Sequence, residues 1–128
     1  MKEILTILIF ITSTVSVKHK DRIVNMINFE GKSESEYFTG KVMSGGVDTQ
    51  FGDSTSYRLS ARYMLEGIDK AGNPCHIFIE NEGFAGEPYT APKILTDSPS
   101  LSFLNDAKLK GKVDDSSGQL TIRIYLSE

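Results

Sequence analysis

Residues Gly40–Phe84, GKVMSGGVDTQFGDSTSYRLSARYMLEGIDKAGNPCHIFIENEGF, decide the fold of this chain. Between residues 57 and 66 the side chains alternate in character, and one face carries Tyr57, Leu59, Ala61, Tyr63 and Leu65. A repeat of two residues is typical of a strand with one buried face. The segment 69–74 predicts a turn, because Gly72 and Asn73 tolerate positive φ. Cys75–Glu82 then predicts the returning strand of an antiparallel hairpin.

Similar patterns predict further strands on both sides of this hairpin. Connections are expected where turn-forming residues gather, at Gly31–Glu36, in a glycine-rich loop over Gly45–Ser54, and in an irregular excursion over Gly83–Pro92. Ser98 is expected to cap a single helical turn that has Pro99 at its first position. The additional expected strands are Ile4–Val17, Arg22–Glu30, Tyr37–Ser44, Lys93–Asp97, Ala107–Val113 and Leu120–Leu126.

This arrangement predicts an all-β protein in which residues 1–128 form a single domain. Short strands with frequent turn signals are typical of a sandwich or a barrel. We favour an antiparallel, closed or nearly closed barrel of about eight strands, because pairing of the apolar first and last strands would remove two exposed edges. A barrel of this size is either filled by side chains or holds one small ligand.

The apolar run Ile4–Val17 has two interpretations. Because it follows Lys2, it resembles a short secretory signal, in which case the protein would be secreted. We favour a strand that stays in the mature protein, because nine of its fourteen residues are β-branched. A strand that is apolar on both faces must be covered on both. Leu8 and Phe10, on the expected outer face, therefore predict a homodimer or a higher homo-oligomer.

Composition argues against several classes of function. A net charge of −3 lacks the basic footprint of a general nucleic-acid binder, and the apolar N-terminal run is too short to span a membrane. Two histidines, His19 and His76, and the single Cys75 make a metal site improbable, and we expect no cofactor. One cysteine without a disulfide partner fits a reducing compartment, which predicts a cytoplasmic location.

Four short motifs resemble the domain of unknown function 3237 family in order and spacing. They cover nearly the whole chain, and they are Gly45-Gly46-Val47-Asp48, Ala61-Arg62-Tyr63, Ile79-Glu80-Asn81-Glu82-Gly83, and Thr96-Asp97-Ser98-Pro99 followed by Phe103-Leu104-Asn105. The resemblance implies a calycin-like or allene-oxide-cyclase-like barrel with a central cavity and no established activity. The chain departs from the family pattern at Thr49 and Phe103, where tryptophan is frequent, and at Ser60, where an acidic residue is frequent.

The candidate ligand-binding residues are polar groups expected near the barrel interior. Asp48 and Gln50 are expected to reach over the barrel mouth from the glycine-rich loop or to form a local turn. Arg62 matches the arginine of the second motif, and it would enter the barrel only if a bulge shifted its strand, or else pair outside with Glu66 or Glu80. The other candidates are Tyr57, Tyr63 and Asn81, which share the apolar face, and Asn105, which either pins a turn or borders the cavity.

Three functions remain open on the sequence alone. The first is binding of a small apolar or amphipathic molecule in the barrel. The second is an isomerase or cyclase that encloses a reactive substrate without a cofactor, so whether the protein is an enzyme stays open. The third is a self-associating structural module without a ligand. A filled barrel would favour the third function, and an open barrel the first two.

Overall fold

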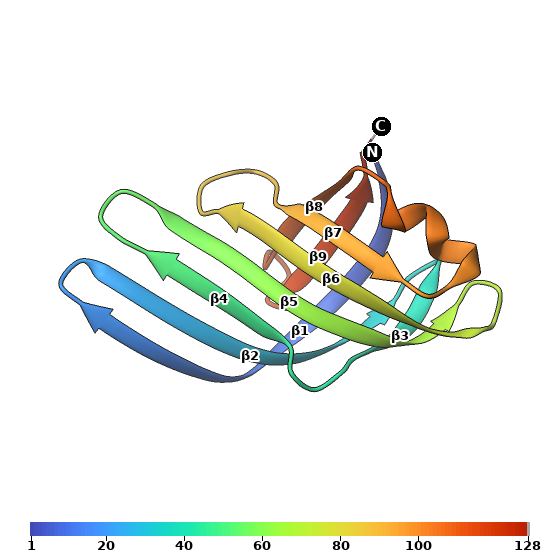
Figure 1. Cartoon of the computed structure of the whole chain (residues 1–128), viewed down its shortest axis with the longest axis horizontal. Helices are drawn as coiled ribbons and strands as arrows, with labels where there is room; N and C mark the ends of the chain where they lie inside the picture. The colour runs from blue at the N-terminus through green and yellow to red at the C-terminus, as the bar shows by residue number, and fades with distance from the viewer. Residues whose placement is uncertain (128) are drawn as a thin grey trace.

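The computed structural model describes residues 1–127, which form nine β-strands and a short 3₁₀ helix. Every pairing between the strands is antiparallel, and Figure 1 shows the strands in one strongly curved sheet. The elements are β1 (Lys2–His19), β2 (Arg22–Glu34), β3 (Phe38–Val42), β4 (Val47–Gly52), β5 (Tyr57–Asp69), β6 (Pro74–Phe84), β7 (Ala91–Thr96), η1 (Pro99–Asn105), β8 (Leu109–Asp114) and β9 (Thr121–Leu126).

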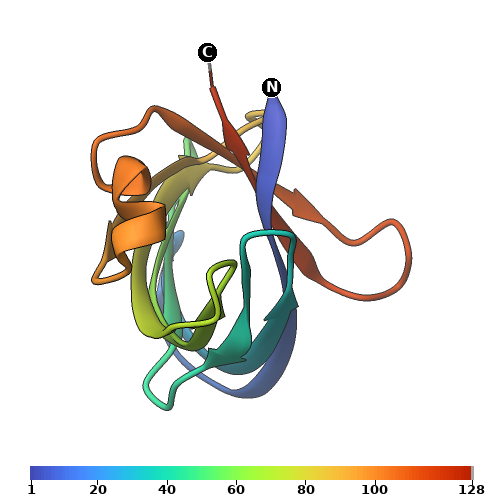
Figure 2. The same ribbon diagram turned by 90° about the vertical axis from the view of Figure 1, so that its right-hand side faces the viewer.

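The strands follow the order β7-β6-β5-β3-β2-β1-β9-β8, and β4 also lies between β2 and β5. The first and last strands of the chain, β1 and β9, pair over residues 2–8 and 121–126, as the sequence predicts. The two edge strands meet where Thr90 and Gly111 exchange backbone hydrogen bonds of 2.8 and 3.0 Å. The sheet therefore curls into a barrel, as Figure 2 shows end-on, and the predicted all-β barrel class is confirmed.

Three predicted connections are shorter than expected, because strand pairing extends into each of them. The segment Gly45–Ser54 contains β4, whose backbone bonds to β2 on one side and β5 on the other. The segment Gly31–Glu36 lies partly in β2, which continues to Glu34. The excursion Gly83–Pro92 is reduced to a short link, because β6 runs to Phe84 and β7 begins at Ala91. In all three, long-range pairing overrides local turn preference.

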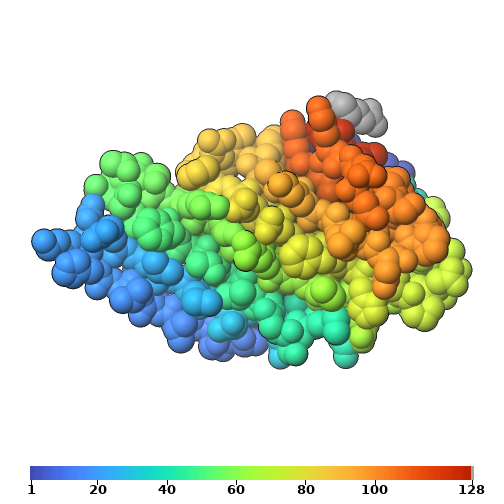
Figure 3. Space-filling view, viewed as in Figure 1, coloured from blue at the N-terminus to red at the C-terminus, as the bar shows by residue number. Residues whose placement is uncertain are grey.

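The N-terminal run is a strand, β1, and its first half forms part of the barrel wall. Leu5 and Ile7 are fully buried, whereas Leu8 is half-buried and Phe10 is 42% exposed. The second half of β1 pairs with β2 in a long hairpin that projects at one end of the molecule, in blue in Figure 3. Within residues 1–127, no helix has the length and apolar character that a bilayer crossing requires.

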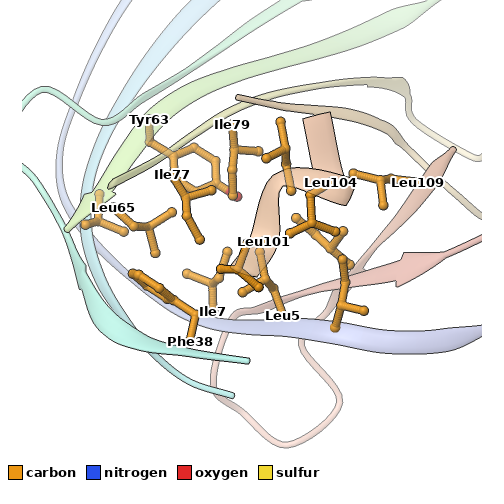
Figure 4. Packing of buried hydrophobic residues seen from close by; sticks show 14 of the residues in the cluster. Leu5, Ile7, Phe38, Tyr63, Leu65, Ile77, Ile79, Leu101, Leu104 and Leu109 are labelled. Atoms are coloured by element: carbon orange, nitrogen blue, oxygen red, sulfur yellow. The ribbon is translucent and has the colours of Figure 1, made fainter. Parts of the chain in front are cut away.

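The barrel interior is filled at the end that η1 covers. Leu101 and Leu104 of η1 are buried against it, and Figure 4 shows the packing of the surrounding side chains. The predicted cap is confirmed, because the Leu101 amide donates to Ser98 Oγ over 3.2 Å. The largest fully buried side chains at this end are those of Leu5, Ile7, Phe38, Leu65, Ile77, Ile79 and Ile124.

Candidate ligand-binding cavity

The other end of the barrel contains a cavity of about 170 Å³. The cavity begins where the filled core stops. On β1 the core extends from Ile4 to Ile9 and the cavity lining continues to Ile11, and on β5 the cavity lining begins at Leu59, before the core residues Tyr63 and Leu65. Two of its apolar residues, Ile11 and Val113, are about half exposed and mark its mouth. Most of its remaining lining is apolar, namely Ile9, Ile27, Phe29, Leu59, Ala61, Leu120 and Ile122, and the polar lining residues are Asp48, Gln50, Tyr63 and Asn81.

Strand register explains why the polar residues gather on one wall. Asp48 of β4 pairs with Ala61 of β5, and Ala61 pairs with Asn81 of β6. Directly paired residues project to the same face of a sheet, so all three side chains enter the barrel. Tyr63 lies two residues beyond Ala61 on that face and is therefore a diagonal neighbour of Asp48. The small side chain of Ala61 leaves space between the carboxylate of Asp48 and the carboxamide of Asn81.

Three buried polar atoms on this wall lack a hydrogen-bond partner among the described residues. They are Oδ1 of Asp48, the hydroxyl oxygen of Tyr63 and Oδ1 of Asn81. Leaving a polar atom buried and unpaired costs about 1–3 kcal/mol each. A stable protein tolerates few such atoms. Three of them on residues that line one cavity indicate a wall suited to a ligand with polar groups of its own.

A chain of hydrogen bonds fixes the orientation of the Asp48 carboxylate. The Asn25 amide donates to the Tyr57 hydroxyl over 3.0 Å, and that hydroxyl donates to Gln50 Oε1 over 2.6 Å. Gln50 Nε2 in turn donates to Asp48 Oδ2 over 2.9 Å. Ser16, near the tip of the β1–β2 hairpin, donates to Asn25 at the outer end. Every donor points toward Asp48, so one carboxylate oxygen is held, and the other is buried without a partner among the described residues.

Tyr63 is a buried phenol at the boundary between the filled core and the cavity. Its side chain is 4% exposed, and its ring packs edge-on against Phe29 with centroids 5.2 Å apart. Burial, with a smaller contribution from the charge of Asp48, raises the pKa of Tyr63 far above its usual range. The hydroxyl is therefore neutral at physiological pH and able to donate a hydrogen bond.

Asn81 lies where the two edges of the sheet meet. It is 7% exposed, and its side chain and that of Thr90 lie against Gly111, where a Cβ would stand 3.3 Å from Asn81 Nδ2 and would overlap Thr90 Oγ1. The Thr90 hydroxyl is also buried and unpaired within the part of the chain that the structure describes. Glycine at position 111 thus allows the edge strands to join beside the polar wall.

The structure brings together Asp48, Gln50, Tyr63 and Asn81 of the seven candidates, and it places Tyr57 directly behind Gln50. Asp48 and Gln50 reach the cavity from strand β4. The loop over the barrel mouth that the sequence predicts for them is therefore wrong. Arg62 lies outside, where its Nε donates to Glu80 over 2.9 Å. Strands β5 and β6 pair in unbroken register from Arg58 to Ile68, so the bulge that Arg62 would need to enter the barrel is not formed there.

Asn105 lies outside the cavity and has a structural role. Its Oδ1 accepts from the Thr96 amide over 2.8 Å, and its Nδ2 donates to the Thr96 carbonyl over 3.3 Å. These bonds hold the end of η1 against β7. Of the two roles that the sequence allows for Asn105, the structure thus favours pinning a turn over bordering the cavity. Sequence reasoning missed Asn25, Thr90 and the space beside Ala61, because their roles depend on neighbours distant in the chain.

The polar lining suits an organic ligand better than a metal ion. Across residues 1–127, no group of three or more His, Cys, Asp or Glu side chains is placed to hold a metal. The cavity offers one carboxylate, two amides and a phenol, which are hydrogen-bonding groups. Such groups orient a molecule whose apolar body fills the remaining volume.

Comparison with known proteins supports the fold and gives no activity. A family model described as "Protein of unknown function (DUF3237)" matches residues 2–108. A structure of a protein with unknown function from Clostridium acetobutylicum ATCC 824 is 23% identical, with a TM-score of 0.80 over 98% of this chain and 94% of that chain. No protein of curated function matches the chain.

Two further solved structures share the fold at lower identity. A beta-barrel like protein from Acinetobacter baumannii AYE is 16% identical, with a TM-score of 0.76 over 98% of this chain and 93% of that chain. A protein described as an enzyme from Penicillium herquei is 17% identical, with a TM-score of 0.75 over 97% of this chain and 92% of that chain. At these identities the likeness extends to the fold alone.

Proposed function

We propose that this chain, which belongs to the DUF3237 family of proteins of unknown function, binds a small and mainly apolar molecule inside its barrel. One observation carries the proposal: Asp48, Tyr63 and Asn81 line a mainly apolar cavity, and each has a buried polar atom without a partner among the described residues. A self-associating module without a ligand would have no use for these atoms. The barrel is filled at the η1 end and open at the other, which favours a ligand.

The polar wall limits the chemistry of this ligand. Oδ1 of Asp48 and Oδ1 of Asn81 can only accept hydrogen bonds, whereas the Tyr63 hydroxyl can donate one. The complementary molecule carries at least one hydroxyl or N–H donor and one oxygen acceptor, such as a hydroxyl-substituted ketone. Because an apolar cavity of about 150 Å³ holds a benzene-sized molecule, the ligand is about the size of one or two small rings.

We predict that Ala61→Leu abolishes ligand binding while the barrel remains folded. Leucine at this position fills the space between Asp48 and Asn81, and it adds apolar surface to a cavity whose lining is already mostly apolar. The measurement is mass spectrometry of small molecules released by gentle denaturation of the purified protein. A molecule found in equal amounts in the wild-type protein and in Ala61→Leu would place its site elsewhere.

Ser60→Leu is the matched control for this prediction. Ser60 precedes Ala61 on β5 but faces outward, beside the carboxylate of Glu82. The substitution adds similar bulk on the same strand without entering the cavity. Ser60→Leu should therefore retain the molecule, and loss of the molecule from both variants would indicate damage to β5 rather than a filled site.

Self-association is a separate proposal, supported by exposed apolar residues on the projecting hairpin. Phe10, Ile11, Val15 and Val17 are 42–67% exposed on β1, and exposed apolar surface of this kind favours association. Light scattering at micromolar concentration should give a mass above the 14.2 kDa of one chain. Phe10→Lys should lower that mass without unfolding the protein, and a wild-type monomer at every concentration would contradict the proposal.

A further inference from the structure

The two oxygens of the Asp48 carboxylate have different roles. Oδ2 accepts the hydrogen bond from Gln50, the last donor of the chain that begins on the β1–β2 hairpin, whereas Oδ1 is buried and has no partner among the described residues, on a residue that lines the cavity. Ligand binding alone would be served by a neutral acceptor such as Asn81, which already lies on the same wall. A carboxylate that is fixed through one oxygen and free at the other has the arrangement of a general base.

Tyr63 supplies the hydrogen-bond donor that such a base requires on the other side of the substrate. Its phenol is neutral and buried, its hydroxyl has no partner among the described residues, and Tyr63 lines the same cavity from the position diagonal to Asp48. The closest approach of side chains on diagonal positions leaves room for a group of a few atoms between them. In a ketone, the carbonyl oxygen can lie next to the Tyr63 hydroxyl while the hydrogen on the neighbouring carbon lies next to Asp48. Phenolic donors directed at a carbonyl stabilise the enolate that forms when that hydrogen leaves.

We infer that the cavity catalyses proton transfer at the carbon next to a ketone carbonyl, with Asp48 as the base and Tyr63 as the hydrogen-bond donor to the carbonyl oxygen. This inference rests on the proposed binding function and names the substrate class of the same site. The substrate is a small cyclic or otherwise compact ketone whose apolar body packs on the aliphatic walls. The reaction class is isomerisation of a ketone through its enolate, with the proton returned to the same carbon or to a conjugated one.

The step balances without a further reactant. Asp48 Oδ1 takes the proton from the α-carbon, and the electron pair of the broken C–H bond forms the C=C bond of the enolate. The π electrons of the carbonyl move to its oxygen, which accepts the hydrogen bond from Tyr63. The protonated Asp48 then returns a proton to the same carbon or to a conjugated carbon, and the C=O bond forms again. Asn81 Oδ1 remains available to orient a hydroxyl substituent of the ketone.

The test is deuterium exchange into small ketones, followed by NMR. Cyclohexanone, 2-indanone and 2-tetralone are each incubated with the protein in deuterated buffer, and loss of the α-CH signal reports proton transfer. Saturation transfer from protein to ketone, in the same sample, reports binding. The wild-type protein should bind at least one ketone and accelerate its exchange. Asp48→Asn should bind that ketone but exchange it about 10²–10⁴-fold more slowly, the usual contribution of a general base.

A second variant keeps the test decisive if Asp48→Asn proves unstable. Tyr63→Phe preserves the ring contact with Phe29, and loss of its hydroxyl should slow exchange about 10²–10³-fold, as loss of one oxyanion donor does. Binding by the wild-type protein without exchange above that of both variants would overturn the inference and leave the binding function standing. Absence of binding to all three ketones would overturn the inference, whereas the binding function would be overturned only if the wild-type protein also released no small molecule on gentle denaturation.

Discussion

Phe38→Ala is expected to lower the free energy of unfolding by about 3–5 kcal/mol, the usual cost of truncating a buried phenylalanine. Phe38 is 1% exposed, and its ring covers the point where β3 and β5 approach through Gly40 and Gly67. A Cβ on Gly40 or Gly67 would lie 2.7 or 2.8 Å from Phe38 Cζ, so the ring rests directly on glycine backbone. Its removal leaves a void and uncovers two adjacent glycines, which cannot fill the space themselves.

Urea unfolding followed by far-ultraviolet circular dichroism would measure this loss, since the chain has no tryptophan to report by fluorescence. The melting temperature should fall by roughly 10–20 °C for a protein of this size. Phe84→Ala is the control, because Phe84 is 51% exposed at the end of β6, and its truncation should cost less than about 1 kcal/mol. Equal losses in the two variants would mean that the filled end of the barrel does not dominate stability.

The alternation of β5 and β6 was sufficient to predict which of their residues enter the barrel. Tyr63 and Asn81 lie inside, and Arg62 lies outside on a regular strand, as their odd or even positions in the two-residue repeat suggest. Parity is reliable here because the two strands pair without interruption, so a register error would have turned every apolar side chain outward. Resemblance to a family motif was a weaker guide for Arg62 than the period of its own strand.

The rest of the candidate site depends on contacts that local sequence does not encode. Glycines flank β4 and predict a loop, but pairing with both β2 and β5 extends this segment and places Asp48 in the wall. The hydrogen bonds that hold its carboxylate join residues from three strands, and each requires the final register. The Thr90 hydroxyl is buried because two sheet edges meet beside it, which no short pattern around that residue indicates.

Two asparagines with opposite roles allow the binding site to be separated from the scaffold. Asn81→Leu should keep or raise the melting temperature, because leucine replaces a buried carboxamide oxygen that has no partner in residues 1–127 with a side chain of similar size. The same change removes an acceptor from the cavity wall. We expect at least about tenfold weaker ligand binding, corresponding to about 1.4 kcal/mol, measured by saturation transfer or by recovery of the co-purified molecule.

Asn105→Leu is the matched variant, and it should give the reverse result. It removes both hydrogen bonds to the backbone of Thr96, a residue that is 7% exposed, so an amide and a carbonyl lose their partners. That loss should cost about 2–4 kcal/mol and lower the melting temperature by roughly 5–15 °C. The cavity lies at the opposite end of the barrel from η1, so binding below the new melting temperature should be unchanged. A large loss of stability in Asn81→Leu, with ligand still bound, would make Asn81 a structural residue and remove it from the site.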